Sequence, residues 1–214
     1  MDDNLLGMNS LMKAVERNDF STIKELEKLN KRDLKDILNQ QNSYGYDLLM
    51  IAVANNNNRI ASYLIKNFNR FIDFNKQDNE DNTVLHIATK YSNNYIIPEL
   101  FEHVNLEIPN QYGSTALITA IMNEEITLKN IKKLILYGAS LEAENNLGDT
   151  VESIFEEVRH RNFSEFLEET KREFEETVYS NVIEKVPEEM INHIISYLLD
   201  GKRKKKKKIL RRKL

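Results

Sequence analysis

The chain has 214 residues, of which 41% are hydrophobic and 30% are charged, and it contains six glycines, three prolines and no cysteine. This composition predicts a folded, helix-rich protein and excludes disulfides, thiolate zinc sites and cysteine nucleophiles. Residues 201–214 hold ten of the 30 basic residues and no acidic one, so residues 1–200 carry 20 basic against 34 acidic groups, a charge of −14. Such an acidic body disfavours binding to nucleic acid.

The N-terminal sequence MDDNLLGMN lacks the basic and apolar segments of a secretory signal. No apolar run reaches the roughly 20 residues that are needed to span a bilayer. We therefore expect no membrane partner, and a location in the cytoplasm with the nucleus as the alternative.

An eight-residue pattern recurs along the chain. Its copies are GMNSLMKA (7–14), GYDLLMIA (45–52), DNTVLHIA (81–88), GSTALITA (113–120) and GDTVESIF (148–155). The fifth position recurs at spacings of 38, 36, 32 and 35 residues. A glycine or aspartate begins each copy and suits a turn, while in most copies a Thr or Asn can cap a helix and a Leu and an Ala three positions apart share a helix face.

A second apolar helix is predicted to follow each copy of the pattern. In the first unit its apolar residues are Phe20, Ile23, Leu26 and Leu29, and in the fourth they are Leu128, Ile131, Leu134 and Ile135. One such pair of helices cannot bury its apolar face alone, whereas a stack of pairs can. The sequence therefore predicts an all-α stack of helix pairs.

The segment TVLHIA (83–88) resembles the T-P-L-H-x-A signature of ankyrin repeats, and LILYGASLEA (134–143) resembles the end of that family's second helix. The resemblance implies an ankyrin-repeat solenoid of about five repeats over residues 1–160, with β-hairpin-like fingers and a concave binding surface. The fifth unit has Glu152 where Leu is expected, which suggests a cap with a more polar outer face.

The resemblance also implies that His86 is structural and that its imidazole bonds to neighbouring backbone, the alternative being a metal or acid–base role. The other histidines are scattered, and no H-E-x-x-H, phosphate-binding loop, G-x-S-x-G or dinucleotide glycine motif is present. The glutamates between residues 165 and 176 are expected to form a solvated helix face. We therefore expect a protein that is not an enzyme and needs neither cofactor nor metal.

Four short turns precede the second to fifth copies of the pattern and form the predicted finger tips. They read NSYG (42–45), DNED (78–81), NQYG (110–113) and NNLG (145–148). The first residue can close each turn with its side chain. The third residues, Tyr44, Glu80, Tyr112 and Leu147, are predicted to be exposed contacts for a target protein. The alternative is that each tyrosine packs flat on its own neighbour.

Residues 161–200 are predicted to form C-terminal helices that include the segment VPEEMINHIISYLL (186–199). Pro187 suits the first position of a helix. The apolar stripe of this helix consists of Met190, Ile191, Ile194, Ile195 and Leu198. Such a stripe either caps the last repeat or binds another protein.

The residues of this segment resemble the start of an F-box, L-P-x-E-[LI]-[LI]-x-x-I-[LI]-S-Y-L. Pro187 and Glu189 match its opening, and the apolar stripe matches the positions that dock on the adaptor Skp1. Val186 replaces the leucine, and a cellular F-box is longer. Repeats followed by such a truncated box resemble the poxvirus ankyrin proteins with a C-terminal PRANC region. The resemblance implies an adaptor that links a host target protein to a Skp1–cullin-1 ubiquitin ligase.

A different class of function is the alternative, namely an inhibitor that masks a host signalling protein, for example in the NF-κB pathway, without its degradation. The tail 201–214 is expected to be disordered. Its basic cluster consists of Lys202, Arg203, Lys204, Lys205, Lys206, Lys207 and Lys208. This cluster suits a nuclear localisation signal in host cells, a weak nonspecific contact with phosphate or acidic surfaces, or a solvated end.

Overall fold

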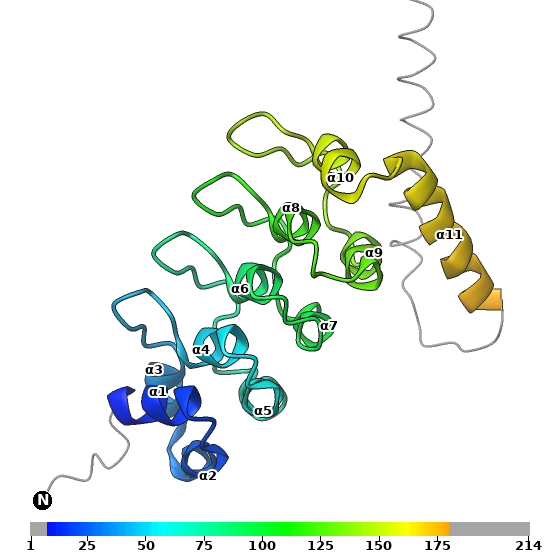
Figure 1. The fold of residues 1–214 in the computed structure, drawn as a ribbon. Helices are drawn as coiled ribbons and strands as arrows, with labels where there is room; N and C mark the ends of the chain where they lie inside the picture. The colour runs from blue at the N-terminus through cyan, green and yellow to red at the C-terminus, as the bar shows by residue number, and fades with distance from the viewer. Residues whose placement is uncertain (1–7, 180–214) are drawn as a thin grey trace, which may run out of the picture.

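The structure is a computed structural model that describes residues 8–179, which form a curved stack of helix pairs (Figure 1). The helices are α1 (Met8–Glu16), α2 (Phe20–Lys24), the 3-10 helix η1 (Glu25–Lys28), α3 (Lys31–Leu38), α4 (Leu48–Ala54), α5 (Asn58–Phe68), α6 (Val84–Lys90), α7 (Ile97–Leu100), α8 (Ala116–Met122), α9 (Leu128–Leu136), α10 (Val151–Arg159) and α11 (Phe163–Tyr179). Residues 8–179 contain no strand beyond an isolated bridge between Glu144 and Thr150, which confirms the predicted all-α class.

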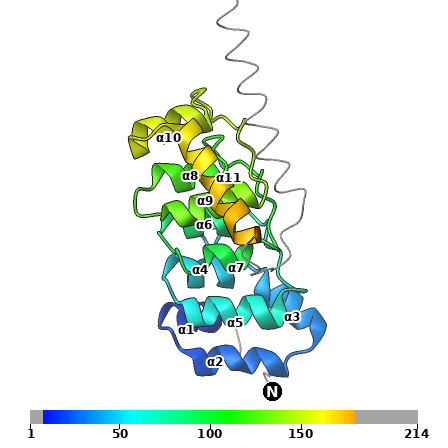
Figure 2. The ribbon, with the colours of Figure 1, turned by 90° about the vertical axis from the view of Figure 1, so that its right-hand side faces the viewer.

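The helices form two layers. Helices α1, α4, α6, α8 and α10 contact one another in this order and make the inner layer, while α2, α5, α7 and α9 make the outer layer. Figure 2 shows the outer side, with α2, α5, α7, α9 and α11 one above the other. Loops that precede the inner helices project away from the outer layer as fingers (Figure 1).

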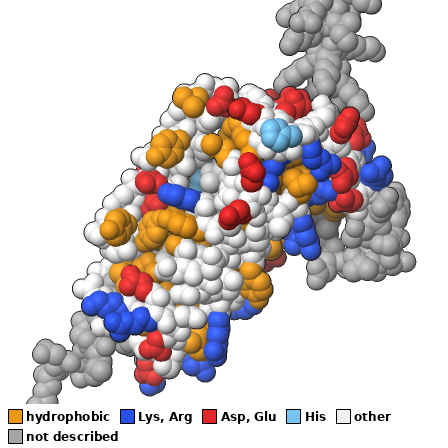
Figure 3. Space-filling view, viewed as in Figure 1, with side chains coloured by type: hydrophobic (Ala, Val, Ile, Leu, Met, Phe, Trp, Pro, Cys, Tyr) orange, Lys and Arg blue, Asp and Glu red, His pale blue; other side chains and the backbone are white. Residues whose placement is uncertain are grey.

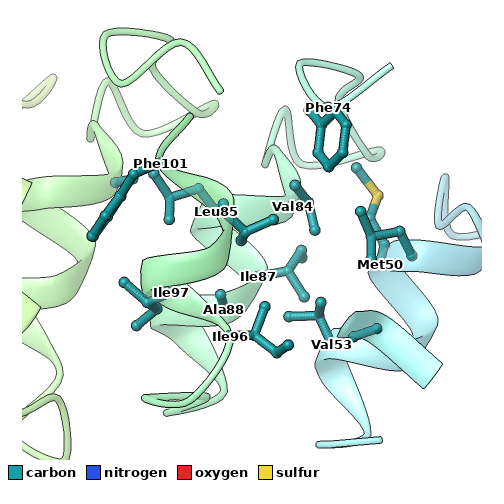
Figure 4. Close-up of a cluster of buried hydrophobic side chains, with 14 of the residues drawn as sticks. Met50, Val53, Phe74, Val84, Leu85, Ile87, Ala88, Ile96, Ile97 and Phe101 are labelled. Carbon is teal, nitrogen blue, oxygen red and sulfur yellow. The ribbon is translucent and has the colours of Figure 1, made fainter. Parts of the chain in front are cut away.

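The central inner helices α4 and α6 are buried along almost their whole length. In α4, six of the seven residues are buried, and the same holds for α6. A helix that is buried all round needs a neighbour on each side. Leu85 and Ala88 are both 0% exposed, as predicted, and side chains from α4, α6 and α7 fill the space between these helices (Figure 4).

The first unit differs from its predicted form. The expected second helix through Leu29 is divided into α2 and the 3-10 helix η1, and a further helix, α3, follows. The side chain of Asn30 accepts hydrogen bonds from the backbone of Arg32 and Asp33, both at 3.0 Å, and so caps α3. Leu34 and Leu38 are the buried residues of this extra helix.

Helix α11 is the outer partner of α10. The rings of Phe163 and Phe166 lie 5.2 and 4.5 Å from that of Phe155 in α10. Two carboxylates of α11 form ion pairs with the Lys132 ammonium of α9, Glu169 at 3.1 Å and Glu173 at 2.7 Å. The helix pairing therefore continues past residue 160, where the sequence suggested the repeat domain would end. The count of about five repeats stays a prediction.

No helix within residues 8–179 is both long and apolar enough to cross a membrane. The F-box-like segment 186–199 and the basic cluster 202–208 lie outside the described residues.

Candidate functional site

Each finger is closed by its first residue. In the finger 42–45, the Asn42 N–H donates to the Tyr46 carbonyl at 2.9 Å, and the Asn42 side chain accepts from the Tyr44 N–H at 2.9 Å. The same pair of bonds is made by Asp78, Asn110 and Asn145 in the other fingers. The predicted turn role of this residue is therefore confirmed.

The fourth residue of each finger has a positive φ, which glycine adopts without steric cost. The angle is 81° at Gly45, 74° at Gly113 and 81° at Gly148. In the second finger Asp81 takes this position with φ 60°. Aspartate is one of the few residues with a side chain that enters this region.

Adjacent fingers are joined through their backbones. The Asn79 N–H donates to the carbonyl of Tyr44 at 3.2 Å. Gln111 donates in the same way to Glu80 at 3.0 Å, and Asn146 to Tyr112 at 2.9 Å. The acceptor is always the third residue of the preceding finger. Its backbone is thereby held in place.

Three of the four predicted contact residues are exposed at the finger tips. Tyr44 is 73% exposed, Tyr112 60% and Leu147 86%, so the tyrosines do not pack flat on their neighbours. Glu80 is different, because its carboxylate pairs with the Lys90 ammonium at 2.9 Å. This bond holds the pKa of Glu80 below its usual value. Whether a target protein touches these four residues stays a prediction.

A groove of about 860 Å³ lies between the second to fourth fingers and the ends of α6 and α8. Tyr112 and Leu147 line it on the finger side, Met122 projects from the end of α8, and Glu124 and Glu125 line it beyond that end. In the space-filling view, hydrophobic side chains gather between the fingers and the helices (Figure 3). Met122 is 55% exposed, and the sequence analysis did not single it out.

Tyr46 and Tyr91 form a second feature that the sequence analysis missed. Their hydroxyl oxygens lie 3.5 Å apart. Burial, together with the hydrogen bond to Tyr91, raises the pKa of Tyr46. Tyr91 remains 40% exposed. These residues stand at non-equivalent positions of two units, so no single repeat pattern indicates the pair.

His86 connects the third unit to the finger that follows it. Its Nδ1 accepts from the Thr83 N–H at 3.2 Å, and its Nε2–H donates to the Ser114 carbonyl at 3.0 Å. These bonds require the neutral imidazole, and burial lowers the pKa of His86 accordingly. The expected structural bond to neighbouring backbone is confirmed.

A set of side chains caps the inner helices from the following unit. Each donates from its amide or guanidinium group to carbonyl groups in the last turn of the preceding inner helix or just beyond it. The bonds are Asn57 to Val15 at 2.6 Å, Asn93 to Val53 at 3.2 Å, Asn123 to Thr89 at 2.7 Å, and Arg159 to Ala120 at 2.9 Å, Ile121 at 3.1 Å and Asn123 at 2.6 Å. These carbonyls have no partner within their own helix. We call these side chains the capping series.

Within residues 8–179, no three or more His, Cys, Asp or Glu side chains lie close enough together to hold a metal ion.

The remaining sequence-predicted residues have structural surroundings. The rings of His103 and Phe74 are stacked with their centroids 4.7 Å apart, and His160 ends α10 with a positive φ of 50°. Along α11, Glu169 pairs with Lys132 and with Arg161.

The geometry defines a stack of helix pairs with a row of hydrogen-bonded fingers, and comparison with known proteins agrees with it. Residues 67–145 match the family described as "Ankyrin repeats (3 copies)". The chain is also 31% identical over 119 residues to "Alpha-latrotoxin-Lg1a" of Latrodectus geometricus. That match covers 55% of this chain and 8% of the relative, so the chain spans less than a tenth of the relative's length.

The chain therefore contains ankyrin repeats, and such repeats are modules for protein–protein interaction. The predicted Skp1-binding residues and the basic cluster lie outside the described residues. The predicted Skp1-binding residues are Pro187, Glu189, Met190, Ile191, Ile194, Ile195 and Leu198. The predicted roles of these residues stay predictions.

Proposed function

We propose that the repeats bind a host target protein through the finger tips and the groove beside them. The observation that carries this proposal is the row of exposed tips, in which Tyr44, Tyr112 and Leu147 stand on backbones joined from finger to finger. A backbone that is already held in place loses little entropy when a partner binds, which favours the apolar and aromatic residues on it as contact anchors. The chain carries out no reaction on this target.

The same proposal assigns the segment 186–199 to a second partner. In this hypothesis its apolar stripe docks on Skp1 and brings the bound target to a cullin-1 ubiquitin ligase. The support is the resemblance of VPEEMINHIISYLL to the start of an F-box. The chain would then act in the host cytoplasm, or in the nucleus if the basic cluster 202–208 serves as a localisation signal.

Direct binding to purified Skp1 tests the adaptor function. We expect the full chain to bind Skp1, and Ile194→Asp combined with Leu198→Asp to abolish binding, because each introduced carboxylate would be buried without a partner. The matched control is Asn192→Asp with Ser196→Asp, which adds the same charge off the stripe and should leave binding intact.

The urea midpoint of the repeats separates the two roles of this segment. An adaptor helix can lose its stripe without a change in the midpoint, whereas a capping helix cannot. If the full chain fails to bind Skp1 at about 50 µM, the adaptor hypothesis is wrong and the masking inhibitor takes its place.

Target binding is tested separately. Replacing Tyr44, Tyr112 and Leu147 together by serine should weaken capture of a host protein that the wild-type chain retains. Binding that survives these changes would move the contact from the finger tips to the inner helices.

A further inference from the structure

We propose that the groove takes an extended protein segment in which a large apolar residue stands next to a lysine or arginine. This inference rests on the protein binding proposed above and specifies the chemistry of the partner. Two features of the groove lead to it, an exposed apolar surface and an excess of carboxylates.

The apolar surface is formed by Tyr112, Leu147 and Met122, which line the groove together and are 60%, 86% and 55% exposed. Tyr112 and Leu147 belong to adjacent fingers that are joined by the bond from Asn146 to the Tyr112 carbonyl. The methionine side chain adapts readily to the shape of a bound group. An aliphatic or aromatic side chain of a partner would find an apolar surface to pack against here.

The carboxylates belong to Glu80, Glu124 and Glu125, and the one ammonium group among the groove residues is that of Lys90. Lys90 is bound to Glu80 at 2.9 Å, and the Ser92 hydroxyl donates to Glu125 at 2.6 Å. Two carboxylates thus remain without a cationic partner inside the groove.

Arg159 lies close to this site without neutralising it fully. Its guanidinium donates to carbonyl oxygens, including that of Glu124 at 3.0 Å, and its positive charge also attracts the Glu124 carboxylate. Counting Arg159, three carboxylates still face two cations. The net charge of −4 on the whole chain adds a weak long-range attraction for cations.

A basic side chain in the partner would give these carboxylates charge-assisted hydrogen bonds, which are stronger than neutral ones. An anionic partner would meet repulsion from the same groups. The groove therefore selects a cationic and apolar segment, and the fingers supply the apolar half of the contact.

Selection from a library of random short peptides displayed on phage, with the full chain as bait, tests this inference. We expect the enriched peptides to pair a large apolar residue with a nearby lysine or arginine. One enriched peptide, synthesised with a fluorescent label, is then titrated with the variants while its anisotropy is followed.

Glu124→Gln combined with Glu125→Gln should weaken binding of this peptide about tenfold, and Met122→Ser should weaken it by a similar factor. The matched control is Glu102→Gln combined with Glu165→Gln, which removes the same charge from exposed positions outside the groove and should leave the affinity unchanged. Added salt should weaken the wild-type complex and affect the Glu124 and Glu125 double variant less.

Enriched peptides that are acidic or lack a basic residue would overturn the inference, and so would groove variants that bind as tightly as the wild type. If binding is lost with Tyr44→Ser but not with the groove variants, the inference fails while the proposed target binding stands. A roughly tenfold gain in affinity on removal of residues 201–214, with no gain when the Glu124 and Glu125 double variant is shortened in the same way, would show that the chain's own basic tail competes for the groove. That result would overturn the assignment of the groove to a separate protein.

Discussion

Leu85 in helix α6 and Leu147 at the fourth finger tip belong to the same repeated array, yet Leu85 is 0% exposed and Leu147 is 86% exposed. Helix α6 is covered by α4 on one side and α8 on the other, so its apolar residues contribute to stability. The fingers meet their neighbours through backbone bonds and through asparagine side chains such as Asn79 and Asn146, whose amides donate to carbonyls of the preceding finger. The exposed side chains of Tyr44, Tyr112 and Leu147 take no part in these bonds and remain available. One array thus separates residues that hold the fold together from residues that can change with the partner.

The largest expected effect comes from shortening a buried side chain of an inner helix. Leu85→Ala should lower the free energy of unfolding by about 2–5 kcal/mol, since it removes a fully buried side chain and leaves a cavity. Leu147→Ala is the matched control and should change it by less than about 0.5 kcal/mol. Equilibrium unfolding in urea measures both, and similar values for the two variants would contradict the comparison.

The junction between a finger and an inner helix should respond to pH. Asp47 caps α4 by accepting from the Met50 N–H at 2.8 Å, and burial raises the pKa of Asp47 from 3.8 to about 6. The folded state therefore binds the proton more tightly than the unfolded state. Proton binding to Asp47 therefore adds to the free energy of unfolding. This contribution is fully present below pH 3.8 and is lost as the pH rises through about 6, a change of about 3 kcal/mol.

The test compares the wild type with Asp47→Asn by urea unfolding at several pH values. Relative to this variant, the wild type should gain stability as the pH falls through this window. The buried His86 has a lowered pKa, so its contribution falls on acidification, but it does so in both proteins and cancels. A difference that does not vary with pH would show that Asp47 is ionised at no cost.

Two glycines of the fingers test how much the contact between adjacent fingers contributes to stability. Both have a positive φ, but a Cβ on Gly113 would lie 2.8 Å from the Asn146 nitrogen of the next finger, whereas one on Gly148 would meet nothing within 4 Å. Gly148→Ala should cost only the backbone strain, about 1 kcal/mol. Gly113→Ala should cost about 2–3 kcal/mol, because the backbones must also separate. Thermal unfolding compares the two, and equal losses would mean that the finger contact adds nothing.

The smallest effect is expected at the tips. Tyr44→Ser, Tyr112→Ser and Leu147→Ser together should leave the helical circular dichroism unchanged and should alter the free energy of unfolding by less than about 0.5 kcal/mol. The reason is that these side chains are exposed, while the bonds between fingers use backbone atoms and asparagine side chains that the three changes leave intact. A larger loss would indicate that the tips support one another.

Local chemistry could be predicted from the sequence. The Asn or Asp that closes each finger and the buried Leu85 and Ala88 follow from patterns within a few residues, and the structural role of His86 follows from the resemblance to ankyrin repeats. Helix α3 was also within reach, since Asn30 is a good cap and Leu34 and Leu38 share one helix face. The break in the second helix of the first unit has no comparable signal.

Contacts between units could not be predicted. The capping series joins residues about one repeat apart, for example Asn57 and Val15, and depends on how the loop between helices turns. The exposure of Met122 depends in the same way on where α8 ends against its neighbours. A single sequence gives the period of the array but does not show which side chains of adjacent units are in contact.

The capping series has a consequence for how such an array can change its length over evolutionary time. Each donor belongs to the unit after its acceptor, so a duplicated block of one full period brings its own donor and finds carbonyl groups already in place. Lengthening by duplication then requires no new side chain to be selected. An insertion or deletion of half a period would separate donor from acceptor at one junction, which favours inheritance of the array in whole units.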